Sequence, residues 1–121
     1  MRRAHRLRAS DDFRRVRRTG RSWAHPLLVL YVARGGSDRT RVGISVSKRV
    51  GGAVVRNRVK RRVRESVRHR YERLQGTTDM MFIVRRPAAT ATFRAIDDAV
   101  ARLLARAELL DPDAWDAQSK R

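Results

Sequence analysis

The sequence of 121 residues contains no cysteine and only 12 acidic residues, and aromatic residues make up 6% of it. Without cysteine there are no disulfides and no thiolate metal ligands, which is compatible with a reducing compartment. No apolar run approaches the roughly 18 residues of a membrane span. The basic N-terminus also lacks the apolar stretch of a signal peptide. We therefore expect a soluble, cytoplasmic protein without a membrane partner.

Positive charge is what the sequence has in excess. Its 30 Lys and Arg residues, set against 12 Asp and Glu, give a formal net charge of +18. A short chain with this excess repels itself at low salt, and a polyanion relieves the repulsion. Nucleic acid is therefore the first partner to expect, and an anionic membrane surface the second. The length and the apolar fraction of 41% indicate a single folded domain.

Turn residues and apolar periodicity predict a helix and two strands in the first half of the chain. A short helix follows Ser10, whose side chain can cap it, and stops at Gly20. Pro26 cannot donate a ladder hydrogen bond, so we expect a break or an edge position there, with room for an extra short strand before it. Residues 27–33 and 41–47 have strand patterns, and we expect them to form an antiparallel hairpin with one face buried.

The second half is predicted to form a helix, a strand and a helix. Apolar residues recur every fourth position from Val55 to Tyr71, a helical stripe that should pack on the sheet and end at Gly76. Residues 79–84 read as a buried strand. Residues 90–107 form an amphipathic helix with these residues facing inward: Phe93, Ile96, Val100, Leu103 and Leu104.

These elements give the order α-β-β-α-β-α, which indicates an α+β fold. One small sheet covered by helices, an α/β sandwich, is the economical arrangement. We assign residues 1–110 to a single domain, in which residues 1–9 form a basic arm. Residues 111–121 have no periodicity and are predicted to be a flexible tail.

The helix predicted after Gly52 carries an unusual charge. Between Ala53 and Arg73 there are nine Lys and Arg residues and two acids. Because a helix turns about 100° per residue, four of the basic residues form a row beside the apolar stripe: Arg56, Lys60, Arg64 and Arg68. Like charges four residues apart destabilise a helix by about 0.2–0.5 kcal/mol per pair. Phosphate binding is therefore the favoured function of this row, and a solvated helix face is the weaker alternative.

The start of this helix resembles the signature motif of a known family, the protein subunit of bacterial ribonuclease P. The similarity lies in Ala53, Arg56-Asn57-Arg58, Val59, Lys60-Arg61 and Val63-Arg64. Three further stretches resemble other parts of the family: "DFRRVRRTGRS", "RVGISVSKRVGGAV" and "VRRPA". The resemblance thus extends from about residue 6 to residue 106.

The resemblance implies a cofactor protein of a catalytic RNA. In that family the ribonucleoprotein removes the 5′ leader from precursor tRNA, with Mg²⁺ held mainly by the RNA. The implied partners are the catalytic RNA and precursor tRNA, with one protein monomer per RNA. The implied fold is αβββαβα around a small mixed sheet, in which the basic helix joins two parallel strands. Its left-handed crossover would be an exception to a strong handedness rule.

The resemblance also implies two sets of site residues. With Lys48 and Arg68 added to the motif, the predicted RNA-binding set is Lys48, Arg56, Asn57, Arg58, Lys60, Arg61, Arg64 and Arg68. The single-stranded leader would bind in a cleft between the first helix and the sheet, at Phe13, Arg17 and Tyr31. Ser45 and Ser47 are added from their own pattern, because they lie on the polar face of the strand predicted at 41–47 and can face this cleft. Arg17 stands where the family usually has a second aromatic, and an arginine can stack on a base as well as bind phosphate. The alternatives are core packing for the two aromatic residues and plain solvent exposure for the two serines.

No catalytic group or metal site is predicted in the protein itself. Hydrolysis without RNA would need convergent carboxylates with metal ions, or a histidine acid–base pair. The only adjacent acids are Asp11-Asp12, in the first turn of a helix, and Asp97-Asp98, which we place on an exposed helix face. The three histidines lack metal-ligand spacing. We therefore expect catalysis to be carried by the partner RNA.

Two other functions stay open on the sequence. A ribosomal or ribosome-assembly protein would share this composition and would bind RNA without an enzymatic role. A membrane-active amphipathic helix is weaker, because the apolar stripe is needed to close the core. That helix also lacks large aromatic residues apart from Tyr71.

Overall fold

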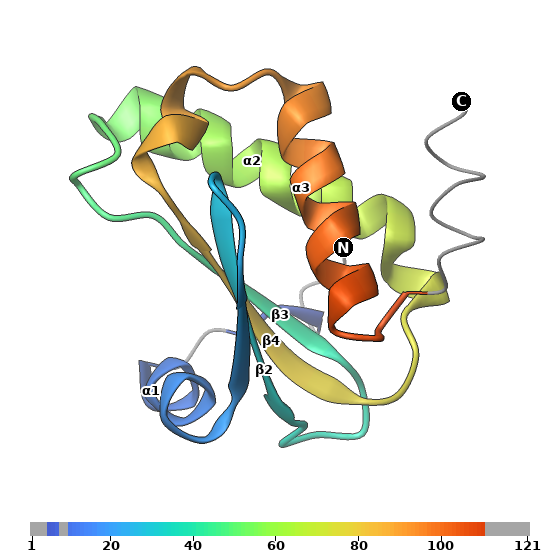
Figure 1. Ribbon diagram of the computed structural model, residues 1–121. Coiled ribbons are helices and arrows are strands. Elements are labelled where there is room, and N and C mark those ends of the chain that lie inside the picture. The colour runs from blue at the N-terminus through green and yellow to red at the C-terminus, as the bar shows by residue number, and fades with distance from the viewer. Residues whose placement is uncertain (1–4, 8–9, 111–121) are drawn as a thin grey trace.

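The computed structural model describes residues 5–7 and 10–110, and the rest of the predicted arm and the tail at 111–121 lie outside the described residues. The elements in chain order are α1 (Ser10–Thr19), β1 (Arg21–Ala24), β2 (Leu28–Arg34), β3 (Arg41–Ser45), α2 (Ala53–Arg70), β4 (Thr78–Val84) and α3 (Phe93–Arg106) (Figure 1). Short 3-10 helices follow α2 and β4: η2 (Tyr71–Arg73) and η3 (Arg86–Thr90). The order αβββαβα is confirmed.

The four strands form one mixed sheet in the order β1-β2-β4-β3. β2 pairs antiparallel with β1 and with β4, whereas β3 and β4 are parallel and are joined through α2. The predicted hairpin of residues 27–33 and 41–47 is wrong, because β4 lies between those two strands. β4 is buried along most of its length, as a central strand must be, and its nearly continuous apolar run is the sequence pattern of such a strand.

The hairpin of this sheet is formed by β1 and β2 instead. β1 is an edge strand whose residues are mostly exposed. The chain turns at Pro26, where the backbone N–H of His25 donates to the carbonyl of Leu28 at 2.8 Å. The extra strand before Pro26 and its edge position are therefore confirmed.

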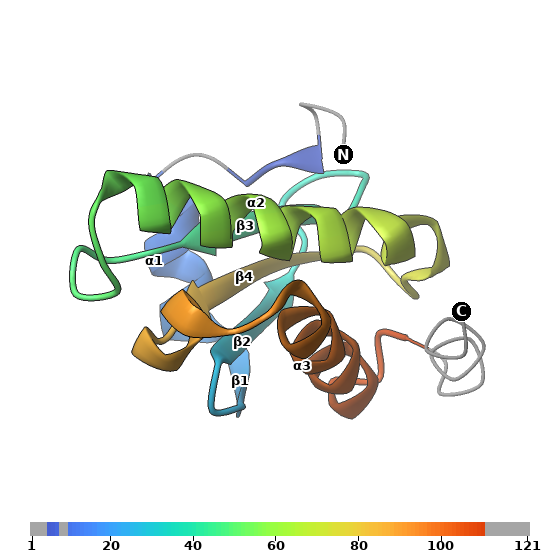
Figure 2. The same cartoon turned by 90° about the horizontal axis from the view of Figure 1, so that it is seen from above.

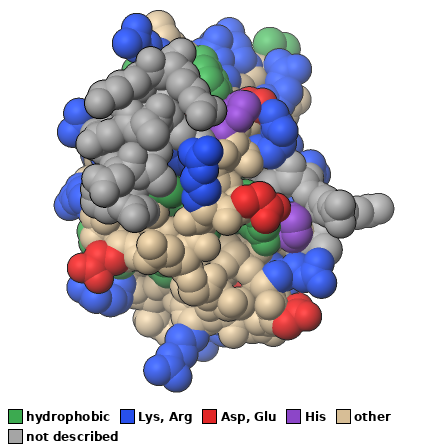
Figure 3. All heavy atoms as spheres, turned by 90° about the vertical axis from the view of Figure 1, so that its right-hand side faces the viewer, with side chains coloured by type: hydrophobic (Ala, Val, Ile, Leu, Met, Phe, Trp, Pro, Cys, Tyr) green, Lys and Arg blue, Asp and Glu red, His purple; other side chains and the backbone are tan. Residues whose placement is uncertain are grey.

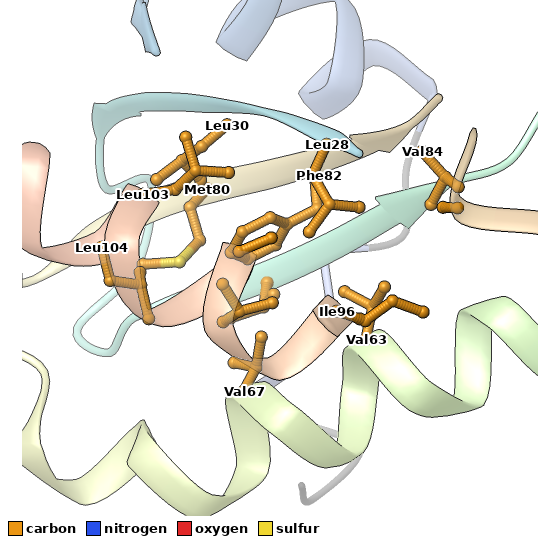
Figure 4. Close-up of a cluster of buried hydrophobic side chains, with 14 of the residues drawn as sticks. Leu28, Leu30, Val63, Val67, Met80, Phe82, Val84, Ile96, Leu103 and Leu104 are labelled. Atoms are coloured by element: carbon orange, nitrogen blue, oxygen red, sulfur yellow. The ribbon is translucent and has the colours of Figure 1, made fainter. Parts of the chain in front are cut away.

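Helices cover both faces of the sheet, with α2 and α3 on one face and α1 on the other (Figures 1 and 2). β4 contributes to both sides because its side chains alternate. Phe82 and its neighbours on one face pack against Val63 and Ile96 from the two helices (Figure 4). Met81, on the opposite face, joins a smaller cluster that includes Val16 of α1.

The apolar stripe of α2 is buried in the core, as predicted. Val59, Val63 and Val67 have no exposed surface, and Val55 and Tyr71 pack at the edge of the same cluster. α2 therefore has no free apolar face to offer to a lipid bilayer. Among the helices of residues 5–7 and 10–110, none combines the length and the apolar character that a bilayer crossing requires.

Two details of the helices differ from the predictions. α2 ends at Arg70 and continues as η2, so the helix stops before Gly76. Tyr71 donates a hydrogen bond to the carbonyl of Thr40 at 2.6 Å, which ties the chain to the sheet at this point. Phe93 was predicted to face inward but is 39% exposed. It is the first residue of α3 and lies beside basic residues of α2 instead of in the core.

Candidate nucleic-acid interface

Basic side chains are spread widely over the surface. On the face that Figure 3 shows, Lys and Arg side chains stand at many places around the outline, with few acidic side chains among them. Net charge alone therefore does not locate a binding site in this protein. What distinguishes the basic residues is whether the protein itself supplies them with a partner.

One set of basic residues on α2 forms hydrogen bonds or ion pairs with other parts of the protein. Arg58 donates to the carbonyl of Ala89 at 3.0 Å, and Arg62 donates to the carbonyl of Ala91 at 2.8 Å. Both bonds tie α2 to the segment between β4 and α3. The predicted contact of Arg58 with RNA stays a prediction, because part of its guanidinium group is occupied by this bond.

Arg70 is the most buried basic residue of α2, with 2% of its surface exposed. Its guanidinium group binds both carboxylate oxygens of Asp97, at 2.6 and 3.1 Å, and Ser66 donates to the same carboxylate at 2.7 Å. Burial raises the pKa of Asp97, but the hydrogen bonds from Arg70 and Ser66 outweigh it and lower that pKa below its usual value. The expectation that Asp97 lies on an exposed helix face is therefore wrong, because it pairs with Arg70.

The second set has no such partners. Within the described part of the chain, no side-chain hydrogen bond or ion pair is formed by four residues of the predicted RNA-binding set: Arg56, Lys60, Arg61 and Arg64. The Nε atoms of Arg56 and Arg64 are buried and unpaired there, as are those of Arg58 and Arg70. What sets Arg56 and Arg64 apart is that their other guanidinium nitrogens form no hydrogen bond with the described residues either. Arg68 differs from these four because it is bound to Glu65, with an Nη2–Oε1 distance of 2.5 Å. Asn57 is exposed at the start of the helix.

A hollow of about 250 Å³ lies where this second set meets the edge of the sheet. It is lined by Arg6, Leu7, Phe13, Val42, Gly43, Ile44, Lys60 and Arg64. Burial, and next the nearby charge of Arg6, lower the pKa of Arg64. Like charges are thus held close together around an aromatic wall, and an anion placed between them would relieve their repulsion.

Gly43 makes room for the aromatic wall of this hollow. A Cβ atom at Gly43 would lie 2.4 Å from Cε1 of Phe13, so no larger residue fits beneath the ring in its present position. Phe13 is half-buried and packs against the small cluster on the α1 side of the sheet. The sequence does contain a signal for this contact, since a glycine inside a strand often marks a close approach.

The predicted leader-binding residues are only partly brought together. Phe13 and Tyr31 belong to the same cluster on the α1 side. The guanidinium carbon of Arg17 lies 5.8 Å from the centre of the Tyr31 ring, within the range of a cation–π contact. Three predicted residues at and beyond the end of β3 do not line the hollow: Ser45, Ser47 and Lys48.

A buried carboxylate positions α1 beside this site. Asp79 of β4 has no exposed surface and accepts two hydrogen bonds from Arg41, at 3.0 and 2.8 Å, and one from the backbone N–H of Gly36. It is also bound by Arg15 of α1. Burial raises the pKa of Asp79, yet the hydrogen bonds from Arg41, Gly36 and Arg15 lower it overall. The sequence offers no periodic signal for this ion cluster.

Part of the predicted basic arm is docked on the edge of the sheet. The backbone N–H of Leu7 donates to the carbonyl of Val42 at 2.9 Å, and Arg6 forms a parallel bridge with the same residue. Leu7 is 3% exposed. His5 stacks on the ring of Tyr71, with 4.2 Å between the ring centres. This docking brings Arg6 to the hollow, a role that no pattern in the sequence indicated.

The side chains around the hollow do not fit a resident metal ion. Residues 5–7 and 10–110 contain no group of three or more His, Asp or Glu side chains that could hold one. Two carboxylates that the structure buries or half-buries, Asp79 and Asp97, already bind guanidinium groups. The side chains that reach the hollow are cationic or apolar, and neither kind is a ligand for Mg²⁺.

Comparison with known proteins identifies the family. A profile of the family described as Ribonuclease P matches residues 1–108. The ribonuclease P protein component of Herpetosiphon aurantiacus is 51% identical over 121 residues, which are 100% of this chain and 98% of that protein. The protein of the same name from Chloroflexus aurantiacus is 49% identical over 111 residues, covering 91% of this chain and 82% of that one.

Solved structures of similar proteins agree with this result. The RNase P protein from Staphylococcus aureus superposes with a TM-score of 0.82 at 32% identity, covering 88% of this chain and 98% of that one. The RNase P protein from Thermotoga maritima has a TM-score of 0.76 at 30% identity, covering 84% and 96%. The sequence, the fold and the basic α2 thus lead to one conclusion: the chain belongs to the ribonuclease P protein component family, the protein part of a ribonucleoprotein endonuclease that processes tRNA.

Proposed function

We propose that this protein binds the catalytic RNA of ribonuclease P through α2 and holds the 5′ leader of precursor tRNA in the hollow beside Phe13. In this role it supports the endonucleolytic cut that removes the leader and produces the mature 5′ end. The observation that carries the proposal is the set of basic side chains without protein partners, Arg56, Lys60, Arg61 and Arg64, on a helix whose other face is fully packed.

The RNA contact follows from the electrostatics of α2. Folded RNA presents rows of phosphates, and each phosphate that a basic side chain neutralises releases a condensed counterion. Arg56, Lys60 and Arg64 lie along one side of the helix at four-residue spacing, so they can follow a phosphate backbone. In the complex their mutual repulsion is offset by the attraction of each side chain to the RNA phosphates. Binding should therefore be strong at low salt and should weaken steeply as salt is added.

The leader contact follows from the composition of the hollow. Unpaired RNA is held by aromatic side chains that stack on its bases and by basic side chains that bind its backbone. Phe13 provides an aromatic wall next to Lys60 and Arg64, and Tyr31 with its neighbour Arg17 extends the surface along the sheet. A single strand without sequence preference suits this arrangement, because every base has a face that can stack.

The phosphodiester chemistry belongs to the RNA in this proposal. The side chains around the hollow supply positive charge and an aromatic surface, and Mg²⁺ held mainly by the RNA supplies the catalytic charge. The protein's basic residues reduce the repulsion between the catalytic RNA and its precursor tRNA, so fewer free Mg²⁺ ions are needed for assembly. We place one protein monomer on each RNA, in the cytoplasm where precursor tRNA is made.

A cleavage assay tests the proposal. Precursor tRNA with a labelled 5′ leader is incubated with the cognate ribonuclease P RNA, with and without the protein, over a range of Mg²⁺ concentrations. We expect cleavage at low Mg²⁺ only with the protein present, and a higher Mg²⁺ requirement for the RNA alone. A tRNA without the 5′ leader, which cannot be cleaved, is the control for binding that does not depend on the leader. An identical Mg²⁺ requirement with and without the protein would overturn the proposal.

A further inference from the structure

A second hollow with an aromatic wall lies on another flank of α2. Its volume is about 500 Å³, and it is lined by Arg61, Arg62, Arg64, Glu65, Arg68 and Phe93. Phe93 and Val54 are the two large apolar side chains that are exposed among the described residues. The ring of Phe93 belongs to neither buried cluster. Packing of the fold therefore does not account for an aromatic side chain at this position.

The wall of this hollow is held in place by the protein. Arg62 donates to the carbonyl of Ala91 at 2.8 Å, two residues before Phe93. The side chain of Thr92 then caps α3 by accepting a hydrogen bond from the backbone N–H of Ala95 at 3.1 Å. The first contact ties the segment before α3 to α2, and the second holds the first turn of α3 in helical form. Phe93 is thus presented on a rigid element, which lowers the entropic cost of binding to it.

The charges of the lining indicate what the hollow can bind. Four guanidinium groups face one carboxylate, and that carboxylate is already bound by Arg68. Arg61 and Arg64 have no side-chain partner within the described residues. A purely apolar partner would leave these charges desolvated, and a free phosphate would make no use of the ring. A nucleotide satisfies both, because its base stacks on an aromatic face while its phosphate binds the arginines.

We propose that this hollow binds one unpaired nucleotide of the catalytic RNA, with its base stacked on Phe93 and a neighbouring phosphate bound by Arg61 and Arg64. The inference rests on the proposed function, since it names a further contact of the same RNA. Arg64 lines this hollow and the Phe13 hollow as well, so the basic row of α2 separates two aromatic walls. The Phe13 side is open to the leader, and the Phe93 side receives the RNA subunit.

A binding experiment tests the stacking contact. Filter binding measures the affinity for a transcript of the ribonuclease P RNA over a range of salt concentrations, without precursor tRNA. Phe93→Leu should weaken binding on the order of tenfold, since base stacking on an aromatic side chain is removed, and should leave the salt dependence unchanged. Phe93→Tyr keeps the ring and should bind within about twofold of wild type. Val54→Ala is the matched control for an exposed apolar side chain and should have no effect.

The phosphate contact is tested with Arg61→Ala. This variant should make the negative slope of log K against log salt shallower by about 0.7–0.9, as expected when one phosphate is no longer neutralised. Arg73→Ala is its control, because it removes an exposed arginine of η2, beyond the end of α2, and it should leave the slope unchanged. Equal slopes for wild type and Arg61→Ala would remove Arg61 from the proposed contact and overturn the proposal as stated.

Chemical probing of the RNA gives a second readout. Wild type and Phe93→Tyr should protect a single unpaired nucleotide that becomes reactive again with Phe93→Leu. Unchanged affinity and protection in Phe93→Leu would overturn the inference alone, whereas a wild type without salt-sensitive RNA binding would overturn the proposed function. If Phe93→Leu lowers the midpoint of thermal unfolding and loses affinity only in proportion to the unfolded fraction, Phe93 is structural and the inference is also overturned.

Discussion

Two groups of basic residues on α2 differ in whether other groups of the protein bind their side chains. Arg58, Arg62 and Arg70 bind backbone carbonyls or a carboxylate of the protein, whereas Arg56 and Arg64 find no side-chain partner within the described residues. The members of the two groups are interleaved along the helix, so a count of charge does not distinguish them. Partnering, and not the number of charges, therefore separates the arginines that hold the fold together from those that the protein leaves without a partner.

Of the variants that test this difference, Arg70→Ala should have the largest effect on the free energy of unfolding. It should lower the free energy of unfolding by about 3 kcal/mol, at the low end for buried pairs, because Asp97 loses its partner while 31% of its side chain stays exposed. Urea unfolding measures the change. Arg61→Ala is the matched control from the other group and should stay within about 0.5 kcal/mol of wild type. Equal losses of stability in the two variants would contradict the division into two groups.

The next largest effect concerns the Phe13 hollow. Gly43→Ala places a Cβ atom 2.4 Å from the Phe13 ring, so the ring must move, at a cost of about 1–3 kcal/mol in stability. Affinity for leader-bearing precursor should fall, while affinity for the ribonuclease P RNA alone should hold. Gly52→Ala is the control, because nothing lies within 4 Å of its added Cβ. If both alanine variants behaved alike, the close contact between Gly43 and Phe13 would have no functional consequence.

Acid should weaken the ion pairs that hold the fold together, because the two carboxylates that bind arginines inside the protein, Asp79 and Asp97, lose their charge. The folded-state pKa values of Asp79 and Asp97 are lowered from 3.8, so the native state binds fewer protons than the unfolded state. Their contribution to stability is complete above pH 3.8 and is lost as the pH falls through the lowered values. Urea unfolding at several pH values measures this loss. Asp97→Asn should flatten the dependence, and an unchanged pH profile in that variant would contradict the assignment.

The smallest effect is expected at Arg17. Arg17 is exposed and lies beside the Tyr31 ring, so Arg17→Ala removes one group that could stack on a base or bind a phosphate and should weaken leader-bearing precursor binding a few-fold. The lost cation–π contact should lower the free energy of unfolding by at most about 0.5–1 kcal/mol. Arg18→Ala removes a neighbouring exposed arginine of α1 and serves as the control. Competition binding with precursors that carry or lack a leader measures the difference. A loss of affinity that does not depend on the leader would place Arg17 outside the leader contact.

The sequence predicted which segments form helices and strands better than it predicted which strands pair. The four-residue period of Val59, Val63 and Val67 identifies the buried face of α2, because that period is a local property of a helix. Strand pairing depends on contacts between distant segments, so local patterns of β2 and β3 suggested a hairpin that does not exist. The apolar run of β4 was the signal for a central strand placed between them.

The sequence indicated which residues form the proposed site, but not which of them the protein itself binds. The family motif on α2 pointed to the basic row, and spacing along a helix showed that these residues lie side by side. Neither could show that Arg58 bonds to Ala89 while Arg64 stays unpaired, because these contacts depend on where η3 and β3 lie. The docking of Leu7 on β3 and the exposed position of Phe93 likewise depend on tertiary packing.

Above all, we infer that three basic residues of α2 bind phosphates of the catalytic RNA without holding the fold together. They are the members of the basic row without a protein partner among the described residues: Arg56, Lys60 and Arg64. The decisive measurement is the salt dependence of ribonuclease P RNA binding by wild type and by the triple variant Arg56→Ala, Lys60→Ala and Arg64→Ala. The negative slope of log K against log salt should become shallower by about 0.7–0.9 for each phosphate that the variant no longer neutralises. The midpoint of thermal unfolding should hold or rise slightly, because repulsion within α2 is reduced. An unchanged slope, or a variant that no longer folds, would contradict this inference.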